Sequence, residues 1–185
     1  MPGRVKAALL SILVLVFSVR AFADCSQWPA RTSSPFRTTA YDLSADGNLL
    51  WVATGYGVRL LENGAIVNSI GLPGSTRVVR AHTGGIAYVG SGSSIYTLKW
   101  DGKSISTLNT VTVTGTVNDL EIVSSALFAA TTTGIAHFDI GIATAPFRTN
   151  IVLPTSAPNV TSLATAKNKL YAADGDATVE IYSVT

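Results

Sequence analysis

The sequence repeats a short hydrophobic segment four times, and each copy has an aromatic residue at its second position. The four copies lie at residues 50–53, 87–90, 127–130 and 170–173. Their aromatic residues are 37, 40 and 43 positions apart. Spacing of this kind is typical of proteins built from one repeated supersecondary unit. We therefore predict four units, over residues 40–75, 76–114, 115–158 and 159–185.

Strand-like segments lie on both sides of each aromatic residue. A turn precedes the aromatic segment, and a hydrophobic anchor is expected eight residues before the aromatic residue. The residues at that position are Leu43, Arg80, Leu120 and Leu163. Arg80 thus replaces the anchor in the second unit. After the aromatic segment, a polar turn leads to an alternating segment at 58–61, 95–98, 135–138 and 179–182.

Two hairpin dipeptides predict a fourth strand in the first two units. Asn63-Gly64 and Asp101-Gly102 both suit a two-residue turn, in which two successive residues need a positive φ. They are 38 positions apart, which agrees with the 37 positions between the first two aromatic residues. In the third unit the connection is longer and covers residues 140–146.

Four strands in each unit, with no helical periodicity after residue 23, predict an all-β chain. One small sheet cannot cover both of its hydrophobic faces, whereas sheets stacked around an axis cover one another. We therefore predict a β-propeller of about four blades with four antiparallel strands each, either complete or part of a larger propeller. A β-sandwich also has many short strands, but it does not require the same ordered series of segments four times.

The first 23 residues have the organisation of a secretory signal peptide. Arg4 and Lys6 precede an apolar run over residues 7–19, and an Ala-Phe-Ala sequence precedes the expected cleavage between Ala23 and Asp24. Cleavage leaves 162 residues with 10 basic and 11 acidic side chains, so the remaining chain has a formal charge of −1. The formal charge of +2 of the whole chain is therefore no reason to expect binding to nucleic acid, and no nucleic-acid partner is predicted. The protein is expected to be secreted or periplasmic, with no membrane span after signal removal.

The last unit stops after its third predicted strand. Residues 24–39 are the candidate for a closing strand, although Pro29 and Pro35 limit it to a short edge strand. Three arrangements remain open: a piece of a longer chain, a closed four-blade ring, or a homodimer in which two copies complete one ring. Cys25 is the one cysteine of the sequence, so no disulfide within the chain is expected.

Two sets of residues resemble known propeller repeats. The segment Asp-Gly-Asn-Leu-Leu-Trp-Val-Ala-Thr at 46–54, followed by Gly57 and Val58, resembles the repeat of two-component-regulator propellers. The segments 134–140 and 170–174 resemble the LVIVD-type repeats of secreted bacterial propellers. The resemblance covers about residues 41–185 and implies an exported bacterial β-propeller repeat protein. Because the shared residues form turns and packing positions, it implies an architecture and no particular activity.

Candidate ligand-binding residues lie in the turns between the second and third strands and in the connections between units. Loops on a rigid scaffold are where binding residues usually lie. Tyr56 offers an amphipathic ring and Arg77 a fixed fork of donors. Asp174 and Asp176 are further candidates, although Asp-Gly-Asp lacks the other oxygen ligands of a calcium loop. An ordinary hairpin role is the alternative for all four residues.

Catalytic chemistry is not concentrated anywhere in the sequence. Asp119 and Glu121 are two positions apart, which places both on one face of a strand, either near the central channel or at a solvated strand end. His82 and His137 occupy different places in their units, so they do not suggest a metal pair. We predict no catalytic residue, no metal and no cofactor.

Three functions fit this architecture. The favoured one is an exported, non-enzymatic β-propeller that binds a protein or a carbohydrate through its loop faces. The second is a fragment of a larger propeller enzyme, similar to lactonases or quinoproteins, which would bring acidic residues from several blades to the axis. The third is part of a periplasmic sensor, which would add further blades and a membrane span.

Overall fold

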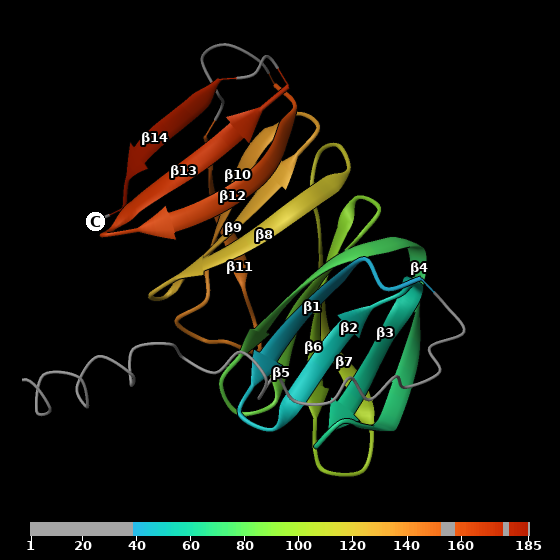
Figure 1. The fold of residues 1–185 in the computed structure, drawn as a ribbon. Coiled ribbons are helices and arrows are strands. Elements are labelled where there is room, and N and C mark those ends of the chain that lie inside the picture. Colours follow the sequence, from blue (N-terminus) through green and yellow to red (C-terminus); the bar gives the residue numbers. More distant parts are fainter. Residues whose placement is uncertain (1–38, 153–157, 176–177, 185) are drawn as a thin grey trace, which may run out of the picture. The chain divides into compact units, whose positions relative to one another are not determined.

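The computed structural model describes residues 39–152, 158–175 and 178–184. In these residues the regular secondary structure consists of strands, so the all-β prediction is confirmed (Figure 1). The strands are β1 (Asp42–Asp46), β2 (Leu49–Ala53), β3 (Gly55–Glu62), β4 (Ala65–His82), β5 (Ile86–Ser91), β6 (Ser94–Trp100), β7 (Ile105–Thr112), β8 (Val117–Val123), β9 (Ala126–Thr131), β10 (Gly134–Asp139), β11 (Phe147–Val152), β12 (Val160–Ala166), β13 (Lys169–Asp174) and β14 (Val179–Ser183). Within the described ranges, no helix is long and apolar enough to cross a membrane.

The strands form three sheets, of seven, four and three strands. In each sheet, neighbouring strands follow one another in the chain and pair antiparallel. The first sheet contains β1 to β7, the second β8 to β11, and the third β12 to β14. The expected closing segment, residues 24–39, lies outside the described residues except for Thr39. Among the described strands, the third sheet therefore has three members.

The first sheet differs from the predicted pair of four-stranded sheets because β4 is continuous. This strand of 18 residues pairs with β3 up to Gly71 and again at Thr76, and it pairs with β5 from Thr76 onward. Thr76 pairs with both Gly55 of β3 and Ser91 of β5, so the partner changes at this residue. Strand β4 continues through Pro73 and through Gly74, which has a φ of 86°, so one strand belongs to two units.

Each structural unit of consecutive strands is called a repeat. Repeat 1 comprises β1 to β3 and the first part of β4, and repeat 2 the second part of β4 with β5 to β7. Repeat 3 comprises β8 to β11, and repeat 4 comprises β12 to β14.

The strand register corrects the assignment of the anchor in repeat 2. Leu43, Leu120 and Leu163 lie opposite Val52, Ala129 and Ala172, the residues that directly follow the aromatic ones. In repeat 2 the residue opposite Val89 is Val79, and Arg80 lies opposite Tyr88. The hairpin of repeat 2 has three residues between His82 and Ile86, whereas the other three hairpins have two. That extra residue moves the anchor by one position, and Arg80 therefore faces the other side of the sheet.

The two hairpin dipeptides form different turns. Asn63 and Gly64 have φ of 50° and 83°, as a two-residue hairpin requires. The Asp101-Gly102 prediction is wrong, because four residues separate Trp100 from Ile105. The Asp101 carboxylate accepts hydrogen bonds from the backbone N–H groups of Ser104 and Lys103, at 2.8 Å each, and so closes a longer loop. These donors hold the pKa of Asp101 below its usual value.

Three hydrophobic clusters lie between consecutive repeats. Trp51 packs with Val79 and Leu98, Tyr88 with Leu120 and Phe138, and Phe128 with Leu163 and Leu170. In each case the aromatic residue of one repeat is buried against the anchor or a neighbouring residue of the next repeat. Each such large side chain stabilises the fold by about 1.5–3 kcal/mol through loss of exposed apolar surface. The periodic pattern in the sequence is thus the pattern of these junctions.

Candidate functional site

Polar side chains gather on the first strand of each repeat. These four inner strands are β1, the second part of β4, β8 and β12, and each lies beside the next. The exposed rim of the same repeats carries a separate cavity between loops of repeat 1 and its connection to repeat 2. The two regions differ in how completely their polar groups are bonded.

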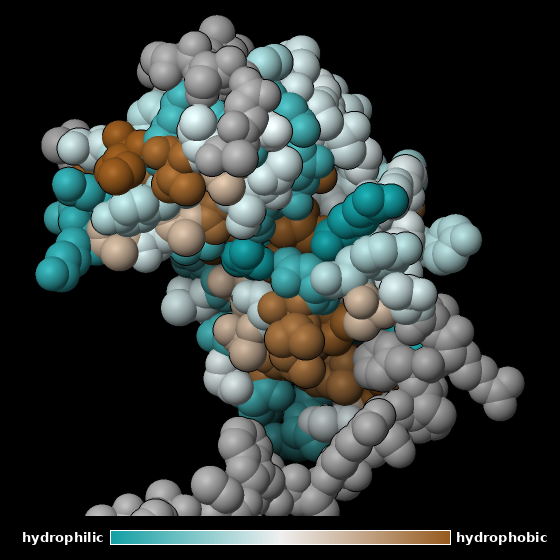
Figure 2. All heavy atoms as spheres, turned by 45° about the horizontal axis from the view of Figure 1, so that its top comes forward, coloured by the Kyte–Doolittle hydropathy of each residue, from teal (hydrophilic) through white to brown (hydrophobic). Residues whose placement is uncertain are grey.

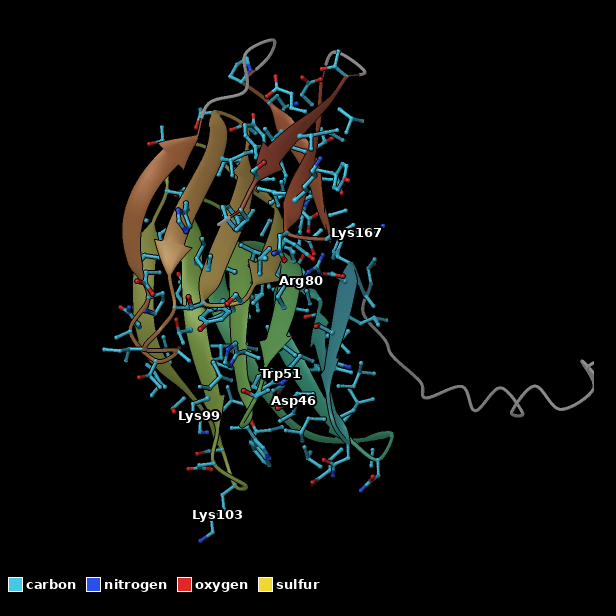
Figure 3. The ribbon with its side chains drawn as sticks, turned by 90° about the vertical axis from the view of Figure 1, so that its left-hand side faces the viewer. Asp46, Trp51, Arg80, Lys99, Lys103 and Lys167 are labelled. Carbon is cyan, nitrogen blue, oxygen red and sulfur yellow. The ribbon has the colours of Figure 1, made fainter. Side chains whose placement is uncertain are left out.

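Arg80 is the centre of the inner-strand region. Its guanidinium donates to Asp42 Oδ2 at 2.8 Å, to Asp119 Oδ1 at 2.9 Å and to Glu121 Oε2 at 3.4 Å. Figure 3 shows Arg80 in the middle of the strands, whereas Lys103 lies at the tip of the β6–β7 hairpin. The four side chains are one-eighth to one-quarter exposed, so water screens the ion pairs only partly. The planar fork of an arginine suits this contact with three carboxylates.

Asp42 and Asp119 have the same role in two different junctions. Each precedes the anchor of its repeat, and each accepts the N–H of that anchor through Oδ1, at 2.9 Å and 2.8 Å. Through Oδ2, each accepts the N–H of the next repeat's anchor: Val79 at 2.9 Å for Asp42, and Leu163 at 2.8 Å for Asp119. An aspartate at this position therefore ties one inner strand to the next.

Hydroxyl groups extend this network to all four inner strands. Ser44 Oγ accepts the Ala81 N–H at 2.9 Å, and Thr165 Oγ1 donates to Glu121 Oε1 at 2.9 Å. Ser162 Oγ donates to Asp119 Oδ2 at 3.1 Å. Every carboxylate oxygen of the three acidic residues thus has a donor within the protein. The spacing of Asp119 and Glu121 placed both on one face, and both contact Arg80.

The loop cavity has a volume of about 510 Å³ and combines aromatic rings with hydroxyl groups. Its lining residues are Thr39, Tyr41, Thr54, Gly55, Tyr56, Gly74 and Ser75. Tyr56 is 83 % exposed and Tyr41 is 52 % exposed. Solvent-exposed aromatic side chains in a concave polar setting are a common feature of ligand sites.

Glycine at position 55 is needed for this arrangement. Gly55 has a φ of 86°, a region that L-residues rarely adopt. A Cβ atom added there would lie 2.9 Å from Cε2 of Tyr41. The Tyr41 N–H donates to the Ala53 carbonyl at 2.9 Å and fixes the residue beside the turn. The backbone of the β2–β3 turn therefore determines where the Tyr41 ring lies.

Arg77 reaches the cavity through Tyr41. Its guanidinium lies over the Tyr41 ring, 5.5 Å from the ring centre, and its Nε donates to Ser75 Oγ at 3.1 Å. The two predicted binding residues Tyr56 and Arg77 are thus brought into one region, with Tyr41 between them. Tyr41 was not predicted, because it precedes the first strand and has no counterpart in the repeat pattern.

The other predicted binding residues have different environments. Asp174 is buried, and its carboxylate accepts from Thr178 N at 3.1 Å and from Thr178 Oγ1 at 2.5 Å, so it closes its own turn. Asp176 lies outside the described residues. His82 is in edge contact with Tyr88, and His137 stacks on Phe128 with 4.7 Å between ring centres. In the described part of the chain, no three histidine, cysteine or acidic side chains form a metal-binding group.

Comparisons with known proteins relate the chain to propeller-like structures. Neither known protein families nor curated proteins match the sequence. Among solved structures, the computationally designed Ika4 protein is similar over 83 % of this chain and 96 % of its own, with a TM-score of 0.69 and 12 % identity. The designed Ika8 protein is similar over 77 % of this chain and 45 % of its own, with a TM-score of 0.60 and 16 % identity. A chain of the mitotic checkpoint complex is similar over 78 % of this chain and 50 % of its own, with a TM-score of 0.68 and 13 % identity.

These similarities concern the fold. The chain spans about half the length of the second and third structures that it matches. The neighbours are propeller-like, so the prediction of a β-propeller-like, all-β architecture is confirmed at that level. The absence of a matching family leaves the resemblance to LVIVD-type and two-component-regulator repeats as a prediction.

Proposed function

We propose that this protein is an exported, non-enzymatic β-propeller that binds a carbohydrate in the loop cavity beside Tyr41 and Tyr56. In this interpretation each repeat is one blade, and the two parts of β4 are the outer strand of the first blade and the inner strand of the second. The observation that carries the proposal is the cavity itself, with two exposed tyrosine rings, three hydroxyl side chains and an arginine beside them.

The chemistry of the cavity suits a sugar. A sugar ring presents C–H groups on its faces and hydroxyl groups around its edge. The rings of Tyr41 and Tyr56 offer apolar surface of matching size, and Thr54 and Ser75 offer hydroxyl groups. Arg77 adds a donor fork that would favour an acidic or hydroxyl-rich sugar. The cavity volume lies in the range of about 300–1,000 Å³ that small-ligand sites have.

The inner strands support a binding protein over an enzyme. An enzyme with its chemistry at the axis needs carboxylates that are available to a substrate. Here the carboxylates come from repeats 1 and 3, and all their oxygens accept hydrogen bonds from the protein. The same groups that would carry catalysis are thus used to join neighbouring strands.

A glycan array probed with the secreted protein tests the proposed function. We expect binding to a restricted set of glycans, and loss of at least tenfold in affinity by calorimetry in Tyr56→Ala. Ile142→Ala is the matched control, because Ile142 is 68 % exposed and lies outside the cavity lining. Binding that Tyr56→Ala leaves unchanged would contradict the proposed site. Binding to peptide libraries alone, lost in Tyr56→Ala, would make the ligand a protein.

Export has its own test. N-terminal sequencing of the product from the native host is expected to begin at Asp24, after removal of residues 1–23. A product that begins at Met1 and remains inside the cell would contradict the proposed location.

A further inference from the structure

The first and the last described repeat expose hydrophobic side chains whose counterparts are buried at every internal junction. One position on the third strand of each repeat faces the following repeat. The residue at this position lies opposite the second residue after the aromatic residue of its repeat. The four residues there are Val58, Ile95, Ile135 and Val179. The first three are at most 1 % exposed, whereas Val179 is 62 % exposed. Ile181, two residues further on the same face of β14, is 57 % exposed. Repeat 4 therefore has the same hydrophobic face as the preceding repeats, but the side chains on this face are exposed.

On repeat 1, the complementary face is exposed at its anchor. The anchors Val79, Leu120 and Leu163 are at most 5 % exposed, because the preceding repeat packs on them. Leu43, the anchor of repeat 1, is 61 % exposed, whereas Val52 and Leu61 on the same face are 3 % and 5 % exposed. Figure 2 shows hydrophobic side chains gathered over the β1–β2 side of the first sheet and, apart from them, over β14. Exposed hydrophobic surface of this kind marks interaction sites.

We infer that a second copy of the chain covers both faces in a head-to-tail dimer. The face with Val179 and Ile181 of one copy packs on the Leu43 face of its partner, as Ile95 and Ile135 pack within one chain. The surfaces match because they are the two sides of one junction that the chain already uses three times. Two copies joined in this way form two identical junctions and a closed ring of eight repeats.

A second copy accounts for both faces at once. If repeat 4 packed on repeat 1 of the same chain, Leu43, Val179 and Ile181 would be buried, and they are exposed. A partner of another kind would have to present both sides of this junction in order to cover both faces. The inference rests on the repeat packing and is independent of carbohydrate binding, so the two proposals fail separately.

The mass in solution tests the dimer. By light scattering at micromolar concentration, the mature protein is expected at twice the mass of one chain. Leu43→Asp and Ile181→Asp place a charge on one face each, and both variants are expected to be monomeric. Ile142→Asp changes an equally exposed side chain on the β10–β11 connection and is expected to remain dimeric. Unchanged circular dichroism spectra would show that the variants fold.

Mixing the two monomeric variants distinguishes a head-to-tail interface from one in which each face packs on the same face of the partner. Leu43→Asp retains an intact Ile181 face, and Ile181→Asp retains an intact Leu43 face. One intact junction can therefore form between them, and the mixture is expected to contain a dimer that neither variant forms alone. A monomeric wild-type protein would overturn the inference. Dimers of wild-type strength in both variants would overturn it as well.

Discussion

The inner-strand network and the loop cavity contain similar residue types and use them differently. In the network, Arg80 and three carboxylates are bonded to one another and to the anchors of neighbouring repeats. In the cavity, Arg77 lies over Tyr41, and Tyr56 is left almost fully exposed. A charged side chain therefore acts as a structural group where all its hydrogen-bond partners belong to the protein. Where flat apolar surface and donors face water, the same residue types are available to a ligand.

The largest expected effect comes from Arg80→Leu. This change leaves Asp42, Asp119 and Glu121 close together without their shared cation. Loss of one partner of a fully buried ion pair destabilises a protein by about 3–5 kcal/mol, and the partial exposure here lowers the expected loss to about 2–4 kcal/mol. Urea unfolding followed by tryptophan fluorescence measures it. Arg77→Leu is the matched control in the cavity, with an expected loss of about 0.5 kcal/mol or less. Equal losses in both variants would remove the distinction between the two regions.

Replacement of Asp119 and of Asp42 by asparagine is expected to lower the free energy of unfolding by different amounts. Asp119 accepts four hydrogen bonds and Asp42 accepts three. In each Asn variant, an NH2 group replaces one carboxylate oxygen. A hydrogen-bond donor then faces the protein donors that the oxygen accepted from. We expect Asp119→Asn to lower the free energy of unfolding by about 2 kcal/mol and Asp42→Asn by about 1 kcal/mol. The reverse order, measured by the same urea unfolding, would show that the number of accepted hydrogen bonds does not determine the loss.

The stability of the core is expected to fall at alkaline pH through Tyr88. Burial raises the pKa of Tyr88 from 10.0 to about 12, and its hydroxyl donates to the Ala143 carbonyl at 2.8 Å. The folded state holds the proton of the Tyr88 hydroxyl more tightly than the unfolded state does. The contribution of this group to the free energy of unfolding is therefore complete below pH 10. It is lost as the pH rises through 12. Tyr88→Phe is expected to cost about 1 kcal/mol at pH 7 and to flatten the pH dependence between 10 and 12. An unchanged alkaline profile in the variant would assign that dependence to other groups.

Thr97→Val is expected to have a small effect in the opposite direction. Thr97 Oγ1 is buried, and it has no hydrogen-bond partner among the described residues. Replacing the hydroxyl by a methyl group removes a buried unpaired polar atom, and we expect a gain of about 0.5–1 kcal/mol in unfolding free energy. A loss of that size in a thermal melt would show that the hydroxyl is satisfied in solution.

The sequence predicted the repeats better than it predicted the polar sites. Aromatic residues spaced 37 to 43 positions apart and the Asn63-Gly64 turn predicted the strands, because hydrophobic burial and turn geometry act locally. The role of Arg80 was missed because one extra residue in a hairpin changes which face a side chain occupies. Its partners lie on other strands, about 40 positions away in the chain, and no local pattern links them. Tyr41 was missed because its position depends on Gly55 and has no repeat partner.

Glycan binding by three variants of the secreted protein tests the division of roles most directly. Tyr56→Ala, Asp119→Asn and Ile142→Ala are titrated with the best glycan of the array at a temperature at which all three are folded. We expect Tyr56→Ala to lose at least tenfold in affinity, with its free energy of unfolding changed by about 0.5 kcal/mol or less, as for most exposed positions. Asp119→Asn and Ile142→Ala are expected to bind as the wild type does. If Asp119→Asn loses binding and Tyr56→Ala retains it, the inner strands are the binding site and the account is contradicted.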